Sequence, residues 1–102
     1  MYIVDNFIDG TANTVSDDSS LIIDPSYGKD IGKVLYATTD SADLAIESAK
    51  QAFENWSQTG LSYRAELILK FRQGVIDRSN EIIDICTTEA GKTRPDAEAE
   101  LD

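Results

Sequence analysis

The spacing of apolar residues divides the chain into a strand-like first part and a helical remainder. In residues 1–39, short runs of β-branched and aromatic residues alternate with turn dipeptides, which is typical of hairpins. From residue 40 onward, apolar residues recur at steps of three and four, which is typical of helices with one buried face. The pattern predicts an α+β fold, with a β-hairpin and strand segment at 1–39 followed by three to four helices at 40–102.

The strand segment is expected to contain two turns and one polar loop. The dipeptide Asp9-Gly10 is a hairpin-turn signal, and the polar residues 11–20 indicate a loop. Asp24-Pro25 stops a strand, and residues 27–30 form the next turn. The expected strands cover residues 2–8, 21–23 and 31–38.

Each helix has a residue that could cap its first turn. Asp40 and Ser62 are the expected caps of the first two helices, and Ser79 or Asn80 begins the third. Gly74 weakens the second helix by up to about 1 kcal/mol relative to alanine. The predicted buried face of the first helix consists of Ala42, Ala45, Ile46, Ala49, Ala52, Phe53 and Trp56, with Trp56 as a core anchor. The second helix is expected to bury Ala65, Ile68, Leu69, Phe71, Val75 and Ile76. The third helix carries Ile82, Ile83, Ile85, Cys86 and Glu89 on its expected buried face.

The letters Gly91-Lys92-Thr93 match the end of a phosphate-binding loop, but their surroundings do not. Cys86 stands where that motif requires its first glycine, and Glu89 would repel a phosphate group. The preceding residues have helical spacing, whereas a phosphate-binding loop follows a strand. We therefore expect a junction between two helices at this point.

The junction has residues suited to both helix ends. Gly91 fits the left-handed position after a helix, and Thr93 can cap the next helix. Pro95 and Asp96 suit a first helical turn. No capping residue follows "PDAEAELD", so the last helix is expected to be truncated, and the chain as a whole to be one partial domain.

The charge and residue counts narrow the classes of function. A net charge of −10 argues against nucleic acid and anionic membranes as partners. One cysteine permits no internal disulfide, and the absence of histidine excludes histidine-based catalysis and metal binding within the chain. Without a signal-peptide pattern or a long apolar run, the protein is expected to be cytoplasmic.

Two groups could carry chemistry, and for both a structural role is favoured. Cys86 lies among apolar residues without a basic neighbour, so we expect an inert core thiol. Glu89 and Lys92 are expected to form a salt bridge or a helix-end contact. The sequence thus predicts no catalytic, cofactor-binding or metal-binding residue in the chain.

Several motifs in order resemble the N-terminal part of the NAD(P)-dependent aldehyde dehydrogenase superfamily. They are "NFIDG", "IIDPSYGKDIGKV", "DLAIESAKQAFENW" and the segment from "YRAELILKF" to "EAGKTRPDAEAE". Asp24 stands where the family usually has asparagine, and aspartate keeps the turn chemistry. "GKTRPDA" is most similar to the branch that acts on succinate semialdehyde.

The resemblance implies an incomplete N-terminal part of the family's α/β coenzyme domain. A full-length parent would oxidise an aldehyde to a carboxylic acid with NAD or NADP. The family's catalytic residues and dinucleotide fold lie beyond the matched region, and Cys86 does not align with the catalytic cysteine. The chain alone is therefore expected to be inactive and to bind neither cofactor nor aldehyde. A monovalent cation held by backbone carbonyls, known in some members, is left open.

A second hypothesis is a free-standing, acidic helical module that binds a protein partner. The missing cap on the last helix disfavours it. Under either hypothesis the apolar helix faces need covering, so we expect the isolated chain to self-associate or to be only partly folded.

Overall fold

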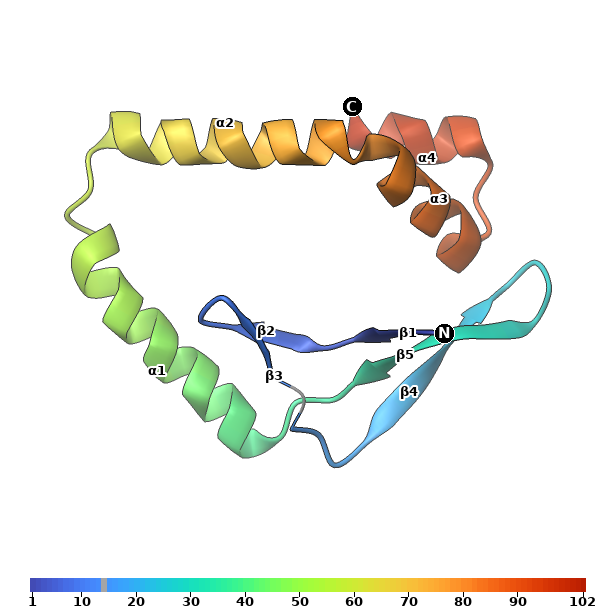
Figure 1. Ribbon diagram of the computed structural model, residues 1–102, viewed down its shortest axis with the longest axis horizontal. Helices are drawn as coiled ribbons and strands as arrows, with labels where there is room; N and C mark the ends of the chain where they lie inside the picture. Colours follow the sequence, from blue (N-terminus) through green and yellow to red (C-terminus); the bar gives the residue numbers. More distant parts are fainter. Residues whose placement is uncertain (14) are drawn as a thin grey trace. The chain divides into compact units, whose positions relative to one another are not determined.

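A computed structural model describes residues 1–13 and 15–102, and it shows strands followed by helices (Figure 1). Thr14, within the predicted polar loop, lies outside the described residues. The elements are β1 (Tyr2–Val4), β2 (Asn6–Ile8), β3 (Thr11–Asn13), β4 (Ser19–Asp24), β5 (Lys29–Leu35), α1 (Thr39–Trp56), α2 (Leu61–Asp77), α3 (Ser79–Ala90) and α4 (Arg94–Leu101). This order confirms the predicted α+β fold.

Contacts between residues group the chain into two units. The first contains residues 1–22 and 30–59, and the second contains residues 23–29 and 60–102. The tip of the β4–β5 hairpin thus belongs with the last three helices. The sequence predicted a strand segment at 1–39 and a helical segment at 40–102, together forming one partial domain. That division follows secondary structure, whereas the two units are defined by contacts, so it stays a prediction.

The first unit contains a hairpin that the sequence predicted only in part. β2 and β3 pair antiparallel, with Asn6 opposite Asn13 and Ile8 opposite Thr11. Asp9 and Gly10 both have positive φ, 51° and 76°, as expected of a hairpin turn. The predicted loop at 11–20 is wrong at both ends, because β3 and the start of β4 fall within it. The strands were missed because their side chains are mostly polar, whereas strand pairing is made by backbone N–H and C=O groups.

The strands β1, β5 and β4 form a sheet in that order, with β1 parallel to β5. β5 begins at Lys29, two residues before the predicted strand, and ends at Leu35. Tyr36 then donates its N–H to the Asp18 carbonyl at 2.9 Å. The parallel partner of β1 was not anticipated, because it lies far along the chain.

Tyr2 lies directly opposite Gly32 in this pairing, and the contact is close. A Cβ atom at Gly32 would stand 2.7 Å from the Tyr2 carbonyl oxygen and 3.1 Å from two ring carbons. Gly32→Ala is therefore expected to lower the free energy of unfolding by about 1–3 kcal/mol, as overpacking does. Urea unfolding measures the change.

Gly74→Ala is the control for that variant. A Cβ at Gly74 meets nothing within 4 Å, and the residue lies inside α2. This variant should raise the free energy of unfolding by about 0.5–1 kcal/mol, the usual helix gain. Equal destabilisation by both variants would contradict the assigned contact with Tyr2.

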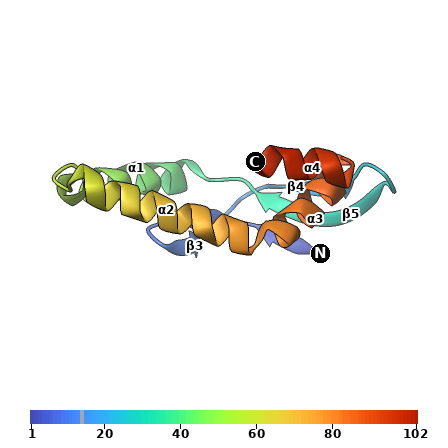
Figure 2. The same ribbon diagram turned by 90° about the horizontal axis from the view of Figure 1, so that it is seen from above.

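Two of the predicted helix caps, Asp40 and Ser62, differ from the observed ones. α1 is capped by Thr38, whose hydroxyl accepts the Ser41 N–H at 3.1 Å, so Asp40 lies inside the first turn. α2 begins after Gly60 without a side-chain cap, so the prediction of Ser62 is wrong. α3 follows α2 after Arg78 alone and begins at Ser79, as predicted. α2 runs unbroken through Gly74 (Figure 2).

Few side chains are buried in the described part of the chain. The buried apolar residues are Ile83 and Ala97, and the buried polar ones are Asp24 and Ser41. The predicted core faces of α1 and α2 are mostly wrong, since Phe53 is 65% exposed, Phe71 is 72% exposed and Trp56 is also exposed. The face of α3 is closer to the prediction: Ile82, Cys86 and Glu89 are half-buried beside Ile83, whereas Ile85 is exposed.

Candidate functional site

The motif that suggested a phosphate site forms a helix junction, as the sequence predicted. Gly91 has φ 64° and ψ 25° and ends α3 in the left-handed conformation. Thr93 is extended and caps α4, accepting the Asp96 N–H at 3.4 Å. Its hydroxyl donates to the Asp96 carboxylate at 2.8 Å. The threonine hydroxyl that would serve a phosphate-binding loop is therefore occupied by the cap.

Lys92 is also engaged, but not by the predicted partner. Its Nζ donates to the carboxylate of Glu100, on the last turn of α4, so the expected pair with Glu89 is wrong. This hydrogen bond is the main cause that raises the pKa of Lys92, with smaller contributions from Cys86 and Asp96. Because α4 packs against α3, Glu100 comes within hydrogen-bond distance of Lys92. The short sequence spacing between Glu89 and Lys92 suggested the other pair and contained no information about this packing.

Cys86 differs from the expected core thiol. It is half-buried rather than buried, and it lies close enough to Lys92 for their charges to interact. The expectation that it has no basic neighbour is therefore wrong. The neighbour was missed because Gly91 reverses the chain after α3, which returns Lys92 toward the helix.

Arg94 joins α3 to α4 through three side-chain contacts. It donates to Asp84 at 2.7 Å and to Asn80 at 2.9 Å on α3, and to Glu98 at 3.1 Å on α4. All four side chains are exposed, so each ion pair contributes little to stability. Two of the three contacts connect α4 to α3, and the third lies within α4.

The tip of the β4–β5 hairpin lies against this junction within the second unit. A Cβ added to Gly91 would meet Pro25 Cγ at 3.0 Å and Ser26 Oγ at 3.7 Å. The buried carboxylate of Asp24 accepts the Ser26 N–H at 2.8 Å, which fixes the turn. This carboxylate is thus used for local structure.

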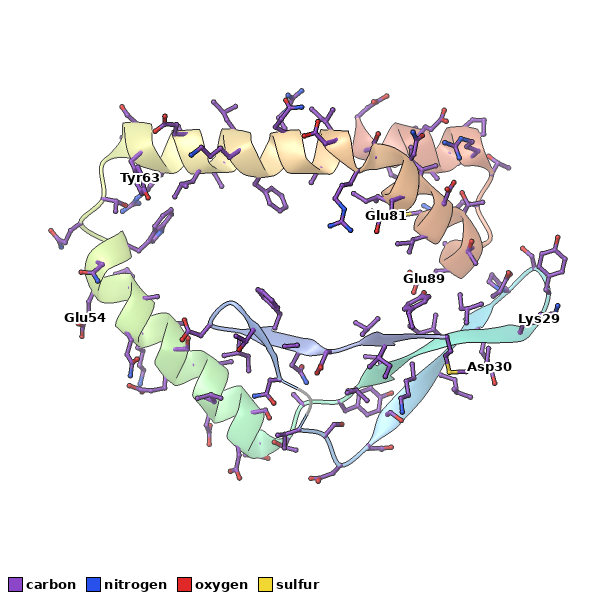
Figure 3. All side chains as sticks on the ribbon, in the orientation of Figure 1. Lys29, Asp30, Glu54, Tyr63, Glu81 and Glu89 are labelled. Carbon is purple, nitrogen blue, oxygen red and sulfur yellow. The ribbon has the colours of Figure 1, made fainter. Side chains whose placement is uncertain are left out.

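An ion pair between Arg78 and Glu81 lies at the boundary between α2 and α3. It is expected to lower the pKa of the Glu81 carboxyl group. Arg78 donates to both carboxylate oxygens of Glu81, at 2.9 Å and 2.7 Å, and Glu81 is labelled in Figure 3. These hydrogen bonds, aided by the positive charge, lower the pKa of Glu81 below its usual value of 4.5. Because the pKa falls on folding, any stabilisation is present above pH 4.5 and is lost as the pH falls through the lowered pKa.

An NMR titration of the Glu81 carboxyl is expected to show this lowered pKa. Arg78→Gln should return the pKa to its usual range, whereas Arg94→Gln should leave it unchanged. An unchanged Glu81 pKa in Arg78→Gln would show that the pair does not form in solution.

The described residues contain no group of three or more His, Cys, Asp or Glu side chains placed to hold a metal ion. Within the same residues, no helix is both long and apolar enough to cross a membrane. A pocket of about 470 Å³ lies between the β2–β3 hairpin and α1 in the first unit. Its lining includes two carboxylates, Asp9 and Glu47, with Asn13, Ser48 and Gln51. This lining contains no cysteine or lysine that could form a covalent intermediate.

Solved structures contain the same fold as part of longer chains. A protein assigned as a methylmalonate-semialdehyde dehydrogenase from Sinorhizobium meliloti 1021, solved in complex with NAD, matches with a TM-score of 0.91 and 36% identity over 97% of this chain. The methylmalonate-semialdehyde dehydrogenase of Oceanimonas doudoroffii matches with a TM-score of 0.93 and 28% identity over 99% of this chain. The matches cover 20% and 21% of those two chains.

Curated relatives show the same proportion. Malonate-semialdehyde dehydrogenase 1 of Bacillus licheniformis is 33% identical over 94% of this chain and 20% of its own length. A mitochondrial, acylating methylmalonate-semialdehyde/malonate-semialdehyde dehydrogenase of Mus musculus is 34% identical over 93% of this chain and 18% of its own length. The chain therefore spans about a fifth of the length of the curated relatives that it matches.

These relatives are named for malonate and methylmalonate semialdehyde, whereas "GKTRPDA" had suggested succinate semialdehyde. The short motif indicated the correct superfamily, but it resembled a different branch from the one for which these relatives are named. A family model described as the aldehyde dehydrogenase family matches residues 13–102. The chain belongs to the aldehyde dehydrogenase family.

Proposed function

We propose that this chain is the N-terminal part of an NAD-dependent enzyme that oxidises malonate semialdehyde or methylmalonate semialdehyde. The observation that carries the proposal is the match to the Sinorhizobium meliloti protein solved with NAD, at 36% identity over 97% of this chain. The Bacillus licheniformis relative, at 33% identity, supports the choice of semialdehyde. NAD rather than NADP is proposed because that solved structure contains NAD.

One observation supports a chain without a coenzyme site of its own. Its one phosphate-loop-like motif has Thr93 occupied as a helix cap and Lys92 occupied by Glu100. We therefore assign the chain a structural role in the enzyme and no step of the reaction. On this proposal the isolated chain is catalytically inactive and binds neither aldehyde nor coenzyme.

The acidic charge supports a proposal about the classes of partner. A net charge of −10 supports a protein that binds neither nucleic acid nor anionic membrane, and a cytoplasmic location stays a prediction. The alternative of a free-standing interaction module gains no support from the comparisons, which match enzymes.

The experiment that tests the proposal starts from the coding sequence after the codon for Asp102. We expect the reading frame to continue to about the length of the relatives. The encoded protein should then reduce NAD with malonate or methylmalonate semialdehyde, with kcat/KM at least about tenfold above that for succinate semialdehyde, a difference of about 1.4 kcal/mol. A preference for succinate semialdehyde would overturn the choice of substrate, and a stop codon directly after Asp102 would favour the module.

A further inference from the structure

We draw no further inference here: the strongest candidate, the apolar groove along α2 and α3 lined by Phe71, Val75, Ile82 and Ile85, carries none, because this chain spans about a fifth of the length of its relatives and nothing in the structure shows what covers the groove.

Discussion

The 102-residue chain, mixed with malonate semialdehyde and NAD, is expected to form no NADH above the uncatalysed background. Oxidation of an aldehyde by NAD requires an activated nucleophile, a base and a site that orients the nicotinamide. The pocket between the hairpin and α1 contains no thiol, and the only cysteine lies half-buried on α3 beside a lysine. Enzymes accelerate reactions at least about 10⁶-fold, so the expected difference from an active relative is of that order.

The assay needs a positive control and a test of Cys86. Malonate-semialdehyde dehydrogenase 1 of Bacillus licheniformis serves as the control under the same conditions. If the chain, verified by mass, reduces NAD in an aldehyde-dependent manner, its assignment as a structural part is wrong. In that case, loss of the activity in Cys86→Ala would assign the nucleophile to the half-buried thiol.

Gly91→Val is expected to destabilise the second unit by about 3 kcal/mol. A left-handed residue other than glycine costs roughly 1–2 kcal/mol, and a β-branched side chain is a particularly poor fit. Gly91 has φ 64°, and an added Cβ would meet Pro25 Cγ at 3.0 Å. Backbone strain and a collision with the hairpin tip therefore act together. Urea unfolding followed by helix content measures the loss.

A matched glycine separates these two causes. Gly28 also has positive φ, 65°, but an added Cβ would meet nothing within 4 Å. Gly28→Val should therefore show the backbone cost alone, about 1 kcal/mol less than Gly91→Val. Pro25→Ala combined with Gly91→Val should recover part of that difference. Equal losses at both glycines would show that the hairpin tip does not contact the junction in solution.

Local signals in the sequence were reliable where a few adjacent residues determine the conformation. The dipeptide Asp9-Gly10 predicted its turn, and Gly91 and Thr93 predicted the end of one helix and the start of the next. These positions depend on backbone conformation and on one hydrogen bond with a near neighbour. Caps chosen from side-chain type alone were shifted: Thr38 rather than Asp40 accepts the free N–H in α1.

Burial and pairing could not be predicted in the same way. The apolar stripe of α1 predicts that one face avoids water, but not which residues are covered. Within the first unit the covered residues include Ser41, Ala45 and Ser48, of which Ala45 alone belongs to the predicted stripe. Lys92 finds Glu100 rather than Glu89 because α4 folds back along α3. Each of these outcomes depends on elements distant in the sequence, which spacing rules do not contain.

The parallel pairing of β1 with β5 also sets an order of events during synthesis. Tyr2 is made before its partner Gly32, which follows only after the whole β2–β3 hairpin and β4 have been made. A hairpin forms within about 1–10 μs, whereas translation adds only about 5–20 residues per second. The hairpin therefore folds while β1 is still an unpaired strand. β1 therefore stays without its parallel partner until β5 has been synthesised, after three other strands.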